Sequence, residues 1–285
     1  MSAIAGPKSS LSVEYNAVAI IVSLIILVLI IAATFMLGIP MALSALIGII
    51  VGGVLIGFGV HFVPVGGAPA AMGQAPGIAT GVAMLAGGAG LAGLFGGAWA
   101  ASQGLVVATV TGAIGGGLMM AITCFFVNVI YVFGMGVPAA SGKVKKDPIT
   151  GDTQPEFKSQ GTEGHGLPFV SFVGGVIGGI FGGGGGTLVY MMLLGLYTAT
   201  LPKLMGSQSV ANSVAILPIA VSLAGVFAIG IFLVNAVLAA YNITGTIEGP
   251  HDPKFKRFPR DIIASAVASG LCGFVAILIA TSIGM

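Results

Sequence analysis

The sequence predicts an all-α integral membrane protein, a polytopic helical bundle of about seven transmembrane helices. No Asp, Glu, Lys or Arg occurs between Tyr15 and Gly142, and a charged residue at the centre of a bilayer costs about 2.5–3.5 kcal/mol. Charged residues make up 6% of the chain and the mean hydropathy is +1.11, whereas soluble domains contain about 25% charged residues. The 285 residues accommodate about six to eight spans of roughly 20 residues. A net charge of +2 does not favour nucleic-acid binding.

Seven apolar segments follow one another, and each is long enough to cross a bilayer as a helix. The first exceeds the roughly 7–15 apolar residues of a secretory signal peptide, so it does not read as one. A tight turn, Gly38-Ile39-Pro40, leads into the second. Polar loops at 134–166 and 241–260 precede the fifth and the last segment. The segments span residues 17–37, 41–60, 77–101, 105–133, 167–197, 210–240 and 262–283.

The distribution of Lys and Arg predicts the orientation in the cell membrane. Cytoplasmic loops are enriched in these residues. The connection at 199–208 holds only Lys203, whereas the two polar loops are much richer. We therefore expect the long loops and the N-terminus in the cytoplasm and the C-terminus outside. The basic residues of the two loops are Lys143, Lys145, Lys146, Lys158, Lys254, Lys256, Arg257 and Arg260.

Segments two to four and five to seven form two sets of three. An odd number of spans in each set gives the sets opposite orientations, which is the inverted repeat of many transporters. A different pattern suggests a direct repeat, because His-x-x-Pro occurs at His61–Pro64 and again at His165–Pro168, each time before a helical hairpin. The sequence leaves both possibilities open.

Glycine is abundant, with 48 residues, and much of it lies in the fifth segment. Rows of glycines spaced by four, such as Gly174 and Gly178, let helices pack closely. The five consecutive glycines 182–186 also permit a break in the helix at membrane depth, which would line a cavity and expose carbonyls to a cation. For Asn128 and Asn235, interhelical hydrogen bonds are the alternative to a role in ion transport. The candidates for a sodium path are Gly182, Gly184, Thr187, Asn128 and Asn235.

Catalytic and metal-binding patterns do not stand out. The three histidines, His61, His165 and His251, lack metal-ligand spacing with Cys, Asp or Glu, so we assign no catalytic, cofactor-binding or metal residue. The predicted spans have no Asp or Glu in their interior, and Asp261 falls at the cytoplasmic end of the last one. Because carriers of sodium or protons commonly place an ionisable residue in the path, we expect a partner to supply the carboxylate.

The loop before the last segment is basic, aromatic and adjacent to the membrane. We expect it to bind anionic lipid head groups, at about 1 kcal/mol per basic residue, or to dock an acidic partner or an anionic substrate. The candidates for contact with lipid or a partner are His61, Pro64, Lys254, Lys256, Arg257 and Arg260.

Several long motifs give the chain a resemblance to a known family. They are VHFVPVGGAPAAM, NVIYVFG, KDPITG, GTEGHGLP, FVGGVIGG and NITGTIEGPHDPKFKR. Over about residues 45–283 the chain resembles the D subunit of tetrahydromethanopterin S-methyltransferase from methanogenic archaea. The resemblance implies that residues 1–40 are an N-terminal extension with an extra transmembrane helix. Residues 41–285 would then be the membrane domain of the family, with six helices.

The resemblance also implies a function. The complex transfers a methyl group from methyl-tetrahydromethanopterin to coenzyme M and exports sodium. This chain would bind no cofactor, the corrinoid (cobalamin) would lie on another subunit, and membrane subunits C and E would be the main partners. Two other functions are possible: an independent secondary transporter with inverted repeats, and a purely structural membrane scaffold.

Overall fold

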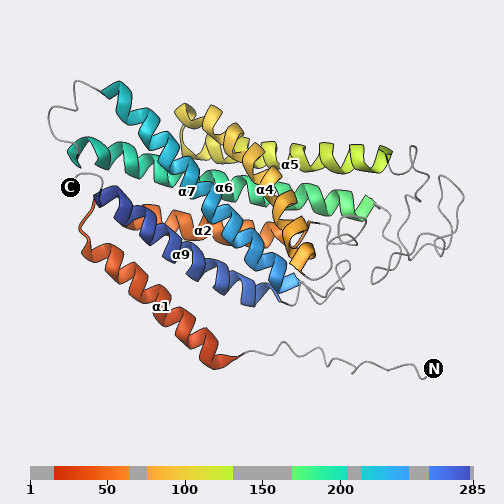
Figure 1. Cartoon of the computed structure of the whole chain (residues 1–285), viewed down its shortest axis with the longest axis horizontal. Helices are drawn as coiled ribbons and strands as arrows, with labels where there is room; N and C mark the ends of the chain where they lie inside the picture. The colour runs from red at the N-terminus through yellow and green to blue at the C-terminus, as the bar shows by residue number, and fades with distance from the viewer. Residues whose placement is uncertain (1–15, 64–75, 131–168, 205–212, 244–256, 283–285) are drawn as a thin grey trace, which may run out of the picture.

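The structure, a computed structural model, is a bundle of long helices (Figure 1) and describes residues 16–63, 76–130, 169–204, 213–243 and 257–282. Within these ranges there is no strand. A short 3-10 turn, η1 (Ala101–Gln103), joins two of the helices. The helices are α1 (Ala17–Met36), α2 (Ala42–Val60), α4 (Pro76–Trp99), α5 (Leu105–Val129), α6 (Phe169–Leu204), α7 (Ser213–Ile243) and α9 (Phe258–Ser282).

Every predicted apolar segment forms a helix, so the all-α membrane bundle is confirmed. In the described part of the chain, six helices are long and apolar enough to cross a membrane. Helix α4 is not among the six, so the exact number of seven spans is not confirmed. Helix α9 begins at Phe258, four residues before the predicted start, and Asp261 therefore belongs to its first turn.

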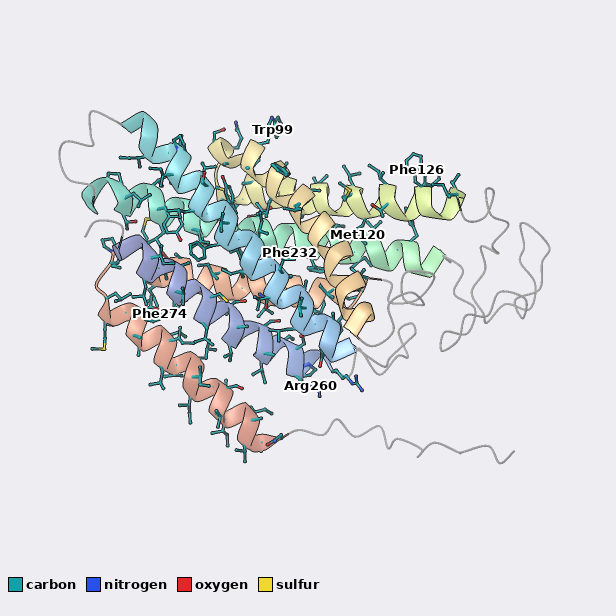
Figure 2. All side chains as sticks on the ribbon, in the orientation of Figure 1. Trp99, Met120, Phe126, Phe232, Arg260 and Phe274 are labelled. Carbon is teal, nitrogen blue, oxygen red and sulfur yellow. The ribbon has the colours of Figure 1, made fainter. Side chains whose placement is uncertain are left out.

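Large apolar side chains cover much of the outer surface of the bundle (Figure 2). Trp99 and Phe126 are exposed and point away from the helices, whereas Met120 and Phe232 are buried between them. A contiguous apolar exterior is unfavourable in water and suited to lipid. The surface therefore agrees with a multi-pass membrane protein.

Helix α1 lies at the edge of the bundle, against α9 and, less closely, α2 (Figure 1). Asn16 caps its N-terminus, because the side-chain oxygen accepts a hydrogen bond from the backbone of Ala19. Only Ile30 and Thr34 of this helix are buried. The boundary at residue 40 between an extension and a membrane domain stays a prediction.

The remaining helices form two sets of three, and each helix of one set runs in the opposite direction to the equivalent helix of the other set (Figure 1). Helices α2, α4 and α5 make the first set, and α6, α7 and α9 make the second. The first helices of the two sets, α2 and α6, pack together, and so do the second helices, α4 and α7. The third helix of each set packs on the first helix of the other set, α5 on α6 and α9 on α2. This exchange of equivalent contacts is the arrangement of an inverted repeat.

Two pairs of glycines fix how α2 and α6 cross. A Cβ atom on Gly52 would lie 2.6 Å from the carbonyl oxygen of Gly185, and one on Gly59 would lie 2.7 Å from that of Gly178. Only glycine allows the two backbones to approach this closely. A two-fold axis through the centre of the crossing exchanges the two helices and turns the contact of Gly52 with Gly185 into the contact of Gly178 with Gly59. Residue 52 of α2 is therefore equivalent to residue 178 of α6, and residue 59 is equivalent to residue 185.

Candidate functional site

The glycine-rich segment of α6 is an unbroken helix. Residues Phe169–Leu204 form one helix, so the predicted break at residues 182–186 is wrong. The reason is packing: a Cβ on Gly183 would collide with the carbonyl oxygen of Gly112 on α5, and one on Gly185 would lie 2.5 Å from the carbonyl oxygen of Gly52 on α2. The alternative interpretation, close helix packing through rows of glycines, is confirmed.

Thr187 is the polar residue at the centre of this packing. Its hydroxyl lies 2.8 Å from the carbonyl oxygen of Gly183 and 3.0 Å from that of Gly93, so it links α6 to α4. Gly182 and Gly184 are buried in the same helix. Asn128 lies in α5, but its side chain is outside the described residues. A sodium path through these four residues stays a prediction.

A buried polar cluster lies where α2, α7 and α9 meet. Because an α-helix has 3.6 residues per turn, residues four apart lie on one face, and such faces of α2 and α9 are in contact. Helix α7 adds two asparagines at the same junction. We call this set the polar seam. It consists of Gly53, Gly57 and His61 of the α2 face, Asp261, Ser265 and Ser269 of α9, and Asn235 and Asn242 of α7.

Glycines on α2 make room for the polar side chains of α9. A Cβ on Gly57 would lie 2.5 Å from the Ser265 hydroxyl and 2.6 Å from Oδ2 of Asp261. A Cβ on Gly53 would collide with the side chain of Ser269. Side chains on α2 at these two positions would therefore displace the polar groups of α9.

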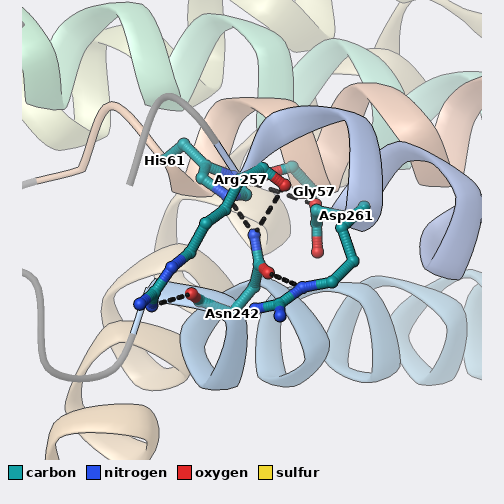
Figure 3. A network of polar contacts seen from close by, with 6 residues as sticks. Gly57, His61, Asn242, Arg257 and Asp261 are labelled. Atoms are coloured by element: carbon teal, nitrogen blue, oxygen red, sulfur yellow. Dashed lines mark hydrogen bonds and ion pairs between the residues drawn. The ribbon is translucent and has the colours of Figure 1, made fainter. Parts of the chain in front are cut away.

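Asn242 joins the three helices at the outer end of the seam (Figure 3). Its side-chain oxygen accepts a hydrogen bond from Nε of Arg260 at 2.8 Å. Its amide nitrogen donates to the backbone oxygen of Arg257 at 3.1 Å and to Nε2 of His61 at 3.0 Å. Nη1 of Arg257 in turn donates to the backbone oxygen of Asn242 at 2.9 Å. A guanidinium can only donate, so Arg260 fixes the orientation of the amide.

The same bonds determine the tautomer of His61. Since the Asn242 amide nitrogen can only donate, Nε2 of His61 is the acceptor and carries no proton. The proton is on Nδ1, which donates to the backbone oxygen of Gly57 at 2.8 Å. The ring is fully buried, and its centroid is 4.5 Å from that of Phe258. His61 is therefore a neutral imidazole with both nitrogens hydrogen-bonded.

Asp261 is the acidic residue of the seam and is 2% exposed. Its Oδ2 lies 3.8 Å from Nδ1 of His61, too far for a hydrogen bond. In the described structure, neither carboxylate oxygen has a hydrogen-bond partner, and the neighbouring Ser265 hydroxyl also lacks one. The sequence placed Asp261 at the end of the last span, and it does lie in the first turn of α9. Its burial was not predicted, because α9 begins one turn earlier than expected and turns Asp261 toward α2.

Asn235 lies deeper in the seam. Its amide nitrogen donates to the Ser269 hydroxyl on α9 and to the backbone oxygen of Ile231, both at 2.8 Å. The predicted interhelical hydrogen bond of Asn235 is therefore confirmed. Its side-chain oxygen is buried and has no partner in the described structure, so a role of this residue toward an ion stays a prediction.

The residues predicted to contact lipid or a partner have different environments. The His61 ring is fully buried between the helices of this chain, and its contact with lipid or a partner stays a prediction. Arg257 is half-buried and Arg260 is exposed, and both hydrogen-bond to Asn242. Pro64, Lys254 and Lys256 lie outside the described residues. External contacts of the two arginines stay a prediction.

Sequence reasoning missed the seam as a unit, although a signal was present. Polar residues recur every four positions at 261, 265 and 269 in an otherwise apolar helix. Small or polar residues recur in the same way at 53, 57 and 61. Two such rows of equal length predict a pair of matching helix faces. That α2 and α9 are the helices that pair could not be read from either row alone.

The position equivalent to the seam in the other set of helices has a different chemistry. In the correspondence of α2 with α6, Thr187 is the residue equivalent to His61. The contact between Thr187 and Gly112 is therefore equivalent to the contact between His61 and Asp261. Likewise Ser265 corresponds to Gly116, since these residues contact the equivalent glycines 57 and 183. The same backbone packing is thus polar on one side and almost free of side chains on the other.

Fold and site together define a multi-pass helical membrane protein with a buried polar junction. Among its described residues, no group of three or more His, Cys, Asp or Glu could hold a metal ion. Comparison with known proteins gives the particular family. Residues 42–269 match the family of the D subunit of tetrahydromethanopterin S-methyltransferase, and the chain belongs to this family.

Individual relatives carry the same name. The chain is 49% identical to the tetrahydromethanopterin S-methyltransferase D subunit of Methanosarcina mazei over 238 residues, which cover 83% of this chain and 94% of the relative. It is 51% identical to the Methanothermobacter marburgensis protein over 80% of this chain and 92% of the relative. For Methanopyrus kandleri the identity is 44%, over 84% of this chain and 97% of the relative.

Proposed function

We propose that this chain is a membrane subunit of a sodium-translocating methyltransferase complex. The complex transfers a methyl group from methyl-tetrahydromethanopterin to coenzyme M and couples the transfer to sodium export. The observation that carries the proposal is the family match over residues 42–269, which extends from the start of α2 into α9. Other subunits are the partners of this chain, and we propose that membrane subunits C and E are the closest.

The chain's own share of the work is in the membrane rather than in the methyl transfer. The buried polar groups of the seam suit the passage or binding of an ion, whereas a corrinoid needs a protein that presents it to soluble carriers. We propose that the corrinoid (cobalamin) lies on another subunit and that this chain binds no organic cofactor.

The proposed orientation places the long loops in the cytoplasm. The helix ends that border residues 64–75, 131–168 and 244–256 all lie at one end of the bundle (Figure 1). Two of these connections carry most of the Lys and Arg residues, which favours the cytoplasmic side. That end would then face the soluble carriers of the methyl group.

Purification tests the proposal. A tag on the C-terminus of the chain, expressed in a methanogen, should bring down the corrinoid-bearing subunits and subunits C and E after detergent extraction. A tagged membrane protein of unrelated family is the control. A chain that is recovered folded but without these subunits would contradict the proposal.

An independent secondary transporter is the second candidate, and the inverted arrangement of the two helix sets favours it. The chain reconstituted alone into liposomes should show no sodium flux if the complex is required. Sodium or solute flux by the isolated chain, above that of empty liposomes, would favour the transporter instead.

A further inference from the structure

We propose that Asp261 and Ser265, facing Gly57, form a binding site for one sodium ion, with Asn235 as the next ligand further inside the bundle. The inference deepens the proposed function and rests on it for the choice of sodium. It assigns the carboxylate to this chain rather than to a partner subunit.

The first argument is a set of buried oxygen atoms without partners. Buried polar atoms in proteins are nearly always hydrogen-bonded, and an exception calls for an explanation such as an ion. In the described structure, both Asp261 oxygens, the Ser265 hydroxyl and the Asn235 side-chain oxygen are buried and lack a partner. All belong to one seam, and each residue is at most 2% exposed. A bound ion would satisfy the Asp261 and Ser265 oxygens together, and the Asn235 oxygen would offer the next ligand further inside.

The second argument is the placement of the neighbouring donors. Nδ1 of His61 lies 2.8 Å from the backbone oxygen of Gly57 and 3.8 Å from Oδ2 of Asp261, so the hydrogen bond of this nitrogen runs to Gly57. The hydrogen bonds of Arg257 and Arg260 run to Asn242. Arg260 acts on the Asp261 carboxylate electrostatically, but its hydrogen bond runs to Asn242. The carboxylate itself faces Ser265 and the backbone of Gly57.

The third argument is chemical. Carboxylate, hydroxyl and amide oxygens are hard ligands that suit alkali and alkaline-earth ions rather than soft metals. A buried charge is stable only when it is paired, and the seam holds one carboxylate. One carboxylate balances one single positive charge, whereas calcium sites gather several carboxylates. A monovalent cation therefore matches the charge of this site.

The ligands follow one another along the seam. Asp261, Ser265 and Ser269 lie on successive turns of α9, and one turn rises about 5.4 Å. Asn235 hydrogen-bonds to Ser269, so its free oxygen lies one step deeper than Ser265. The glycines of α2 keep the facing side free of side chains at the same levels.

The test measures sodium binding to the purified complex in detergent, without turnover. Unfolding temperature is compared in sodium chloride and choline chloride at equal ionic strength, and bound ²²Na⁺ is counted. The variants are Asp261→Asn and Ser265→Ala, and Ser222→Ala, an exposed serine on α7, is the matched control. Ligand binding to the folded state raises the unfolding temperature, so sodium should stabilise the wild type and the control.

The expected result is that Asp261→Asn abolishes the sodium-dependent rise in unfolding temperature. Ser265→Ala should weaken ²²Na⁺ binding about tenfold or more, as is usual for lost ligand support. Equal sodium binding by Asp261→Asn and the wild type would overturn the site, since the Asp261 carboxylate would then not be a ligand of the ion. A wild-type complex without any sodium effect would overturn it too, and this measurement needs no variant to fold.

Failure of the site and failure of the proposed function give different results. If the wild-type complex drives sodium transport by methyl transfer and the Asp261→Asn complex does so equally well, the site is wrong and the function stands. If the chain never co-purifies with the corrinoid-bearing subunits, the function is wrong whatever the variant binds.

Discussion

Asn242 illustrates how one side chain holds three helices together. Its amide contacts His61 after α2 and Arg257 and Arg260 at the start of α9, and these bonds fix both its own orientation and the tautomer of His61. A residue with only a donor or only an acceptor could not make this set.

Asn242→Ala should destabilise the folded chain by about 1–3 kcal/mol, because buried partners lose their hydrogen bonds. Unfolding in mixed detergent micelles, followed by circular dichroism, measures the change. Gln103→Ala is the control, since this amide is exposed in η1. Equal stability of the two variants would show that the network contributes nothing.

Among the helices, the contact of α2 with α6 depends on specific glycines. A Cβ at Gly178 would lie 2.5 Å from the carbonyl oxygen of Gly59, whereas a Cβ at Gly182 would lie 3.4 Å from the ring of Phe232, an ordinary contact. The two glycines are one turn apart in the same helix, so replacing either one by Ala changes the helix propensity by the same amount. A comparison of the two Ala variants therefore separates the effect of packing from the effect of helix propensity.

Gly178→Ala should cost about 1–3 kcal/mol through overpacking and reduce recovery of the assembled complex. Gly182→Ala should be neutral or stabilising by up to about 1 kcal/mol, the usual gain of Ala over Gly in a helix. The measurement is unfolding temperature together with yield of complex. The reverse order of the two variants would contradict the close contact of α2 and α6.

Helix α1 is the element with the weakest ties to the rest. It packs mainly on α9, with Ile30 and Thr34 as its buried residues. We expect a chain that starts at Met41 to keep the other helices and to co-purify with the same subunits as the full chain. Loss of helix content beyond that of α1, measured by circular dichroism, would show that α1 is part of the core.

Much of the element structure could be predicted from the sequence, and the failures have physical causes. All apolar segments became helices because lipid-compatible runs of about 20 residues leave the backbone few alternatives. The start of α9 was placed too late because Pro259 and Arg260 suggested a loop. Proline is tolerated in a first turn, where its missing N–H would be unpaired in any case, and this error concealed the buried position of Asp261.

For the candidate site, single residues could be predicted but their grouping could not. Asn235 was recognised as a polar group inside a span, and its interhelical bond was expected. That Asp261 and Ser265 face Gly57 depends on which helices pack together, and hydrophobic periodicity does not encode partners. The break at residues 182–186 was a reasonable expectation from local propensity, and close packing against α2 and α5 overrides it.

For the whole molecule, the orientation in the membrane can be measured by labelling single cysteines from either side. A cysteine replacing Ser102, exposed in η1, should react with a membrane-impermeant maleimide only from outside the cell. A cysteine replacing Ser159, in the loop 134–166, should react only in inverted vesicles. The wild type measures the background of Cys124 and Cys272. Labelling of both positions from the same side would contradict the proposed topology.

The unequal chemistry of the two matching crossings has a consequence for direction. In a carrier made of two identical halves in opposite orientation, the two sides of the membrane are equivalent. Here the crossing of His61 and Asp261 has Thr187 and Gly112 as its counterpart, so only one of the two matching crossings carries a carboxyl group. If the proposed sodium transport passes this junction, an ion would meet a charged crossing on one half of the chain and an uncharged crossing on the other, so the two directions of passage would not be equivalent.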